Sequence, residues 1–236
     1  MVSTETETPT FFLITSSGPA ADYQGDMFVF GLYRITEQMT DGRSVYMQEH
    51  DAQYGGSPCK LYSSKGLWVV TWDGKEWLRA VTPSDGPTSV KWQFLDYNTW
   101  RDDPALTVTG LSEKPSECEV TISLSQDIVR DIRDLGERVA GVYRANGSYR
   151  YGRPVLQHSG GLFTLSVGGW GCWRVQSGVG GVWYLYSGSA PSQCPADPRA
   201  ARNERRGETH WGYGNKSGEY TESSGISVNC DECIIK

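Results

Sequence analysis

The feature that most restricts the fold of this chain is an internal duplication with a period of about 110 residues, far longer than a propeller blade or a solenoid repeat. Residues 31–34 (Gly-Leu-Tyr-Arg) return as residues 141–144 (Gly-Val-Tyr-Arg), and a Gly-Arg-x-Val motif follows each at the same distance, at 42–45 and at 152–155. Further pairs align in the same order: Leu61 with Phe163, Gly66 with Gly168, Trp68 with Trp170, Trp77 with Trp183, Trp92 with Trp211, and 106–109 with 226–229. Each copy is therefore expected to be a domain, not a stacking unit.

We place copy one at residues 11–118 and copy two at residues 119–236. Both copies contain short runs of β-branched and aromatic residues bounded by Gly, Asp and Ser, a pattern that predicts strands. The expected strands cover 28–33, 44–47, 67–72, 76–81 and 106–109 in copy one, and 139–143, 154–158, 162–167, 171–175 and 182–186 in copy two. Asp73-Gly74 suits a tight hairpin turn. The prediction is a mainly β protein of two tandem antiparallel, barrel-like meanders with five or six strands each.

One helix is expected between the copies, over residues 125–136, with Ser125 as its N-cap and Gly136 at its end. Its apolar face comprises Ile128, Val129, Ile132 and Leu135, and we expect this face to pack between the copies. The matching stretch of copy one, 16–22, contains Gly and Pro and is expected to be a loop.

Charge and hydropathy exclude two classes of partner. The net charge of −6 argues against a dedicated nucleic-acid binder, which is typically basic. Mean hydropathy is −0.48, and no apolar run approaches the roughly 18 residues of a membrane span. An insertion in copy two, 190–207, carries Arg199, Arg202, Arg205 and Arg206 and is expected to be an exposed loop.

The repeated tryptophans are the first candidate binding residues. Exposed aromatic rings on a β domain can stack on the C–H groups of sugars, whereas rings at repeated positions can equally fill two similar cores. The candidates are Trp68, Trp77 and Trp92 in copy one and Trp170, Trp183 and Trp211 in copy two. Trp72, Trp100 and Trp173 have no clear match between the copies, which favours the surface for them.

Two repeated arginines are the other candidates. Arg43 and Arg153 each adjoin an expected turn, where a guanidinium can hold a carboxylate or a pair of hydroxyls. The alternative is that each stacks on a neighbouring ring or forms a local ion pair.

We therefore expect a non-catalytic, lectin-like protein that binds carbohydrate or another small ligand, with protein partners as a further class. Two weak sites on one chain raise avidity without new chemistry. The alternative is an enzyme, a hydrolase or an oxidoreductase, with an aromatic-lined pocket between the copies and His50, His158 or His210 at its wall. No cofactor is expected.

The six cysteines bear on both metal binding and location. Cys230 and Cys233 have the spacing of half a zinc site that Cys194 and His210 could complete, but a terminal disulfide or free thiols are favoured and no metal is expected. We expect Cys59 to pair with Cys118, and Cys194 with Cys230 or Cys233. Because such bonds persist outside the reducing cytosol, the expectation is a secreted protein.

Overall fold

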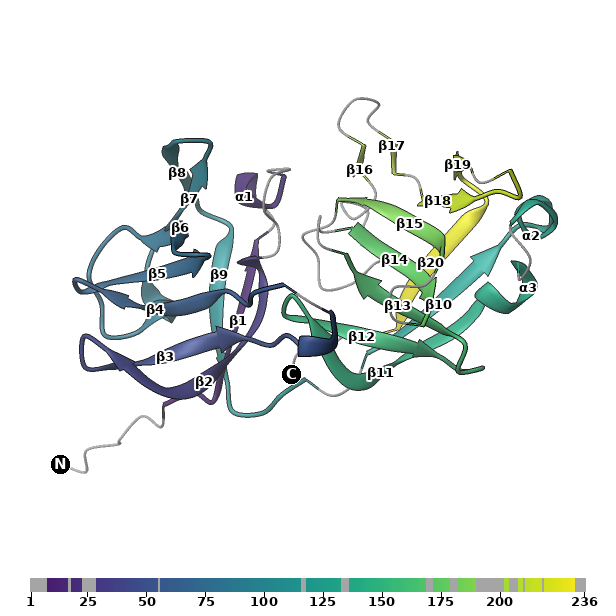
Figure 1. The fold of residues 1–236 in the computed structure, drawn as a ribbon. Coiled ribbons are helices and arrows are strands. Elements are labelled where there is room, and N and C mark those ends of the chain that lie inside the picture. The colour runs from purple at the N-terminus through teal and green to yellow at the C-terminus, as the bar shows by residue number, and fades with distance from the viewer. Residues whose placement is uncertain are drawn as a thin grey trace.

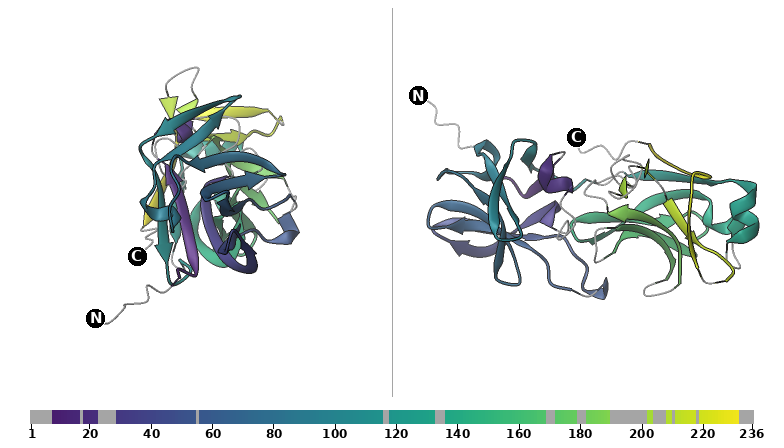
Figure 2. Two further views of the ribbon diagram at one scale, coloured as in Figure 1. Left: turned by 90° about the vertical axis from the view of Figure 1, so that its left-hand side faces the viewer. Right: turned by 90° about the horizontal axis from the view of Figure 1, so that it is seen from above.

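The computed structural model describes residues 8–16, 18–22, 29–54, 56–115, 118–132, 136–168, 172–178, 182–189, 202–203, 208–209, 211–217 and 219–231. Two antiparallel nine-stranded sheets make up the fold, and each curls into a nearly closed barrel (Figure 1). The barrels lie side by side, as the view from above in Figure 2 also shows.

The sheet of copy one has the order β8-β7-β6-β5-β4-β3-β2-β1-β9. Its strands are β1 (Phe11–Ser16), β2 (Gly31–Thr40), β3 (Arg43–Gln48), β4 (Lys60–Ser64), β5 (Leu67–Trp72), β6 (Lys75–Ala80), β7 (Trp92–Asp96), β8 (Thr99–Asp103) and β9 (Leu106–Leu111). A one-turn helix, α1 (Pro19–Asp22), stands where a loop was expected, and two 3-10 turns, η2 (Ala52–Tyr54) and η3 (Pro87–Ser89), lie in the connections. The sheet is a meander whose last strand returns to pair with its first.

The sheet of copy two has the order β19-β18-β15-β14-β13-β12-β11-β10-β20. Its strands are β10 (Glu119–Leu124), β11 (Gly141–Arg150), β12 (Arg153–His158), β13 (Phe163–Val167), β14 (Cys172–Ser177), β15 (Trp183–Ser189), β18 (Trp211–Gly214), β19 (Tyr220–Ser223) and β20 (Ile226–Asp231). A separate two-stranded ladder joins β16 (Arg202–Asn203) to β17 (Glu208–Thr209); the rest of the 190–207 insertion lies outside the described residues.

The two orders match strand for strand, which confirms the mainly β fold and the duplication. Each sheet has nine strands, however, and not the five or six expected. A shared hydrogen bond supports the match: the buried Tyr33 hydroxyl donates to the Val29 carbonyl, and the buried Tyr143 hydroxyl donates to the Val139 carbonyl at 2.6 Å. Each barrel has its own apolar core.

The ladders correct the alignment of one tryptophan pair. Counted along the ladders from the matched tyrosines, Ser63 opposite Trp68 in β4–β5 corresponds to Val167 opposite Trp173 in β13–β14. Trp173, and not Trp170, is therefore the counterpart of Trp68.

A second tryptophan pair is misaligned by a single residue. Leu78 in the β5–β6 ladder is equivalent to Leu185 in the β14–β15 ladder. The residue before each leucine is Trp77 in copy one and Tyr184 in copy two. A β-bulge at this point puts Tyr184 on the core side together with Leu185, whereas Trp183 lies opposite Gln176, the neighbour of the core residue Val175, and so on the other face.

The helix expected over 125–136 is shorter than predicted and does not lie between the copies (Figure 1). Helix α2 runs over Gln126–Asp131 and a second turn, α3, over Gly136–Val139. Ser125 is the N-cap residue, but its hydroxyl makes no capping hydrogen bond. Ile128 and Ile132 are buried in the core of copy two itself, and Figures 1 and 2 show α2 and α3 at the end of that barrel remote from copy one. The expectation that this face packs between the copies is wrong.

The cysteines also differ from expectation. Cys59 is a buried thiol and Cys172 a partly buried one, so the predicted Cys59–Cys118 bond is wrong. Cys118 and Cys230 each take part in a disulfide bond, while Cys194 and Cys233 lie outside the described residues. Cys118 directly precedes β10, and Cys230 belongs to β20, the strand that pairs with it.

The copies are joined by a hairpin of copy two that inserts against the end of copy one. The Gly152 carbonyl accepts a hydrogen bond from Leu32 N at 2.8 Å, and Gly152 N donates to the Glu49 carbonyl at 2.8 Å. Asp51 N donates to the Tyr149 carbonyl at 2.9 Å. A small apolar cluster covers these bonds: Phe11, Leu13, Leu32, Leu111 and Tyr149. The junction therefore combines backbone pairing with apolar packing.

Candidate functional site

Three of the six candidate tryptophans belong to the barrel cores. Trp68, Trp92 and Trp211 are 3%, 2% and 6% exposed. The indole N–H groups of the first two donate to backbone carbonyls, Trp68 to Ser84 and Trp92 to Pro87. No face of these three rings is open to stack on a sugar. Trp170 lies outside the described residues.

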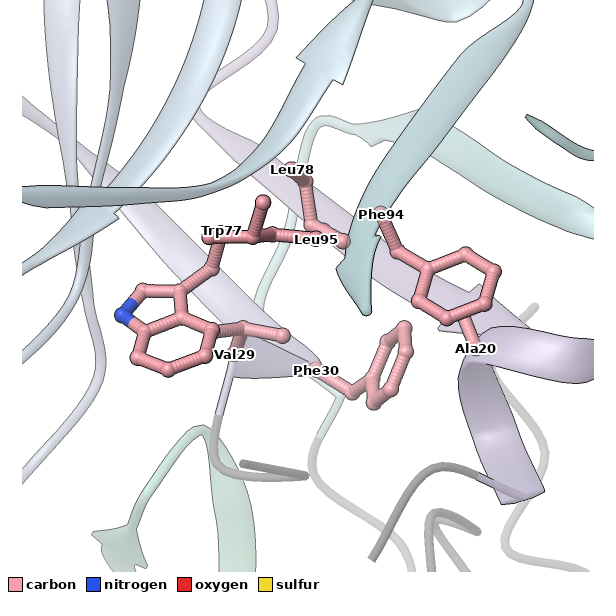
Figure 3. Close-up of a pocket in the computed structure, with 7 residues that line it drawn as sticks. All are labelled: Ala20, Val29, Phe30, Trp77, Leu78, Phe94 and Leu95. Carbon is pink, nitrogen blue, oxygen red and sulfur yellow. The ribbon is translucent and has the colours of Figure 1, made fainter. Parts of the chain in front are cut away.

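Trp77 borders a small apolar pocket in copy one (Figure 3). The other residues that line it are Ala20, Val29, Phe30, Leu78, Phe94 and Leu95. Its volume of about 20 Å³ has room for roughly one water molecule. The ammonium of Lys75 lies 4.0 Å from the centre of the Trp77 ring. This pocket is too small for a sugar ring and carries no titratable side chain.

Trp183 is the candidate that the structure leaves open, with 43% of its surface exposed. It lies at the start of β15, and the guanidinium carbon of Arg174 in β14 is 4.4 Å from the centre of its ring. Trp173 and Val175 point into the core, so Arg174 between them points to the outer face of the barrel. One indole and one guanidinium thus form a stacked pair on the outside of copy two.

Two tyrosines extend this pair across the sheet. Tyr186 lies directly opposite Arg174 in the β14–β15 ladder, and its ring meets that of Tyr220 from β19 at 5.0 Å, edge to face. Gly212 on the intervening strand makes room, because a Cβ there would lie 2.5 Å from the Tyr186 ring. Tyr220 is 52% exposed. We call Arg174, Trp183, Tyr186 and Tyr220 the basic-aromatic face.

Arg174 and Tyr186 are both partly buried, and burial is the main cause of the shift in the pKa of each side chain. Burial and then the nearby charge of Arg150 lower the pKa of Arg174 to about 10. Burial, followed by the carboxylate of Glu222, raises the pKa of Tyr186. Arg174 therefore remains a cation at neutral pH, and Tyr186 remains a neutral hydroxyl that can donate and accept hydrogen bonds.

The candidate arginines Arg43 and Arg153 occupy equivalent places with different surroundings. Arg43 donates to the Ser63 hydroxyl at 3.0 Å, pairs with Asp85 at 3.2 Å and lies 6.0 Å from the centre of the Trp68 ring. Arg153 is fully buried, and burial lowers its pKa to about 10 while the nearby Tyr33 of copy one opposes that shift. Both arginines are engaged within the protein, and the structure brings neither together with Trp183.

The described histidines support the backbone. His50 Nδ1 accepts a hydrogen bond from Tyr151 N at 3.1 Å across the junction. His158 Nδ1 accepts one from Gly160 N, and its Nε2 lies 3.0 Å from the Ala140 carbonyl. His210 lies outside the described residues. Neither described histidine is among the residues that line the pocket beside Trp77.

The described part of the chain contains no cluster of three or more His, Cys, Asp or Glu side chains suited to a metal ion. None of its helices has the length and apolar character needed to cross a membrane. Comparison of the chain with protein-family models, curated proteins and solved structures found no match.

Three of the four residues of the basic-aromatic face were not among the candidates: Arg174, Tyr186 and Tyr220. Aligning the two copies identifies the residues that they share, whereas these three positions carry different residues in copy one. A usable signal was present in β14, where the polar residues Cys172 and Arg174 alternate with the apolar Trp173 and Val175.

Proposed function

We propose that this protein is a non-catalytic, lectin-like carbohydrate-binding protein, and that the basic-aromatic face of copy two is its binding surface. The observation that carries the proposal is the exposed indole of Trp183 beside the guanidinium of Arg174. An aromatic ring offers the C–H groups of a sugar an apolar, electron-rich surface, and a neighbouring fork of N–H groups suits its oxygens.

The tyrosines add to this support. Tyr220 is 52% exposed, and its ring packs against Tyr186, which lies opposite Arg174. Two tyrosine rings and an indole thus share the outer face of the sheet from β15 to the edge strand β19 and form an open platform. Such a platform suits a chain of sugar units, whereas a drug-sized small molecule is typically enclosed in a cleft.

The test is a glycan array followed by calorimetric titration of the bound glycan. We expect Trp183→Ala to weaken binding at least tenfold. The matched control is Trp100→Ala in copy one, since Trp100 also lies under a guanidinium, that of Arg79 at 4.1 Å, and should leave binding unchanged. Absence of glycan binding, or equal losses in the two variants, contradicts the proposal and directs the search to protein partners.

A further inference from the structure

We infer that the basic-aromatic face selects acidic saccharides, whose carboxylate or sulfate group pairs with Arg174 while a sugar ring stacks on Trp183. This inference rests on the proposed carbohydrate-binding function and deepens it by naming the chemistry of the ligand.

Arg174 has no carboxylate partner among the described residues. Five other arginines pair with an acid: Arg34, Arg43, Arg101, Arg130 and Arg144. The nearest acid along the row of Arg174 is Glu222, three strands away across Tyr186 and Gly212. At about 4.8 Å per strand, this places Glu222 roughly 14 Å from Arg174, outside direct pairing. The positive charge of Arg174 is therefore available to an anion.

The guanidinium of Arg174 is held in a fixed orientation. On one side it lies against Gly168, where a Cβ would sit 3.3 Å from the guanidinium carbon, and on another it stacks near Trp183. Stacking engages the flat faces of a guanidinium and leaves its N–H edge able to bind two oxygens of a carboxylate or sulfate. The Nε atom of Arg174 is buried and makes no hydrogen bond.

A buried hydroxyl adds a second unused polar group. Ser166 lies directly opposite Arg174 in the β13–β14 ladder and so belongs to the same face of the sheet. It is 0% exposed, and its Oγ makes no hydrogen bond. An unpaired buried hydroxyl is unfavourable in proteins, and a polar ligand group would relieve that cost.

Copy one shows what the same strands look like without such a site. Val69 occupies the position of Arg174, and Arg79 takes that of Tyr186. The Arg79 guanidinium donates twice to the Gln93 amide oxygen at 3.0 Å, and the Gln93 amide donates to Asp102 at 2.8 Å. Two N–H groups of Arg79 are thus engaged within the sheet, in a hydrogen-bonded chain that ends at Asp102, and acid selectivity is expected of copy two alone.

The experiment titrates the full chain with three tetrasaccharides of equal length: one carboxylated, one sulfated and one neutral. We expect at least one acidic tetrasaccharide to bind tenfold or more tighter than the neutral one, with a preference that falls as salt screens the charges. Arg174→Gln should abolish the preference, weakening the binding of the acidic tetrasaccharide by a larger factor than that of the neutral one. Arg174→Lys, which retains the charge but not the two-pronged geometry, should keep part of it. The control is Arg101→Gln, an exposed arginine paired with Asp96 in copy one.

Each outcome decides. Equal binding of acidic and neutral saccharides overturns acid selectivity and leaves carbohydrate binding standing. A preference that survives Arg174→Gln also overturns it. Binding of none of the three overturns the proposed function with it. Should Arg174→Gln fail to fold, Arg174→Lys decides: a reduced preference with Arg101→Gln unchanged supports the inference, and an undiminished preference, or an equal loss in Arg101→Gln, contradicts it.

Discussion

The outer faces of the two copies carry different chemistry on equivalent strands. In copy one the row across β5, β6, β7 and β8 reads Val69, Arg79, Gln93, Asp102; in copy two the equivalent row reads Arg174, Tyr186, Gly212, Glu222. The inward residues of these strands remain apolar in both copies. Burial therefore restrains the inner face of each strand. The outer face differs: in copy one it carries a hydrogen-bonded row of polar side chains, and in copy two it carries the basic-aromatic face.

The β-hairpins at the Gly-Arg motifs differ in the same way. Both turns have positive φ at their two central residues, Asp41 and Gly42 in copy one and Tyr151 and Gly152 in copy two, as a type I′ turn requires. The first hairpin carries Met39, which is 61% exposed. The second inserts at the junction. The same hairpin backbone is therefore exposed in copy one, whereas in copy two it packs against the other domain.

The largest expected effect tests the corrected register. Trp173→Ala removes a ring that is 0% exposed and should lower the free energy of unfolding by about 3–5 kcal/mol. Trp183→Ala, on the outer face, should cost about 1 kcal/mol or less. Urea denaturation of both variants measures the difference. Comparable losses would mean that Trp183 belongs to the core and that the ladder alignment fails.

The next largest effect on stability tests the contact between the copy-two hairpin and copy one. A Cβ at Gly152 would lie 2.7 Å from Leu32 N and 2.9 Å from the Gly31 Cα, and these backbone atoms cannot turn aside. A Cβ at Gly42 meets nothing within 4 Å. Since both glycines have similar positive φ, both substitutions strain the turn equally, and Gly152→Ala should cost about 1–3 kcal/mol more than Gly42→Ala. Equal unfolding midpoints for the two variants would show that the junction does not form in solution.

The sequence predicts most of the architecture because the signals of strands and turns are local. The Asp73-Gly74 hairpin, the matched tyrosines and the equivalence of Trp92 with Trp211 follow from residue type and spacing, and the structure confirms them. The exact register of the strands does not follow from residue type and spacing. A shift of one residue, as in the alignment of Trp183 with Trp77, leaves the strand's composition unchanged but moves a side chain to the other face of the sheet. The sequence did not predict the basic-aromatic face for a related reason: it lies where the residues of the two copies differ.

A smaller effect separates the two outer faces. Gln93→Ala removes the link between Arg79 and Asp102 and should cost about 1 kcal/mol of stability with no change in saccharide binding. Gly212→Ala at the equivalent position should displace the Tyr186 ring, which a Cβ would approach to 2.5 Å, and weaken saccharide binding several-fold. Calorimetry and thermal unfolding of both variants test the pair. A binding loss in Gln93→Ala would assign the ligand to copy one.

The smallest effect concerns the repeated arginines. The partner of Arg43, the Asp85 carboxylate, is fully exposed, so solvent screens the ion pair, and Arg43→Ala should lower the free energy of unfolding by about 1 kcal/mol, chiefly through the lost hydrogen bond to the buried Ser63 hydroxyl. Arg153→Ala is the positive control: its side chain is fully buried beside copy one, and its removal leaves a void that should lower the midpoint. Neither variant should alter saccharide binding, because neither arginine reaches Trp183. If Arg43→Ala weakens binding, the hairpin of copy one belongs to the ligand site and the assignment of binding to copy two is wrong.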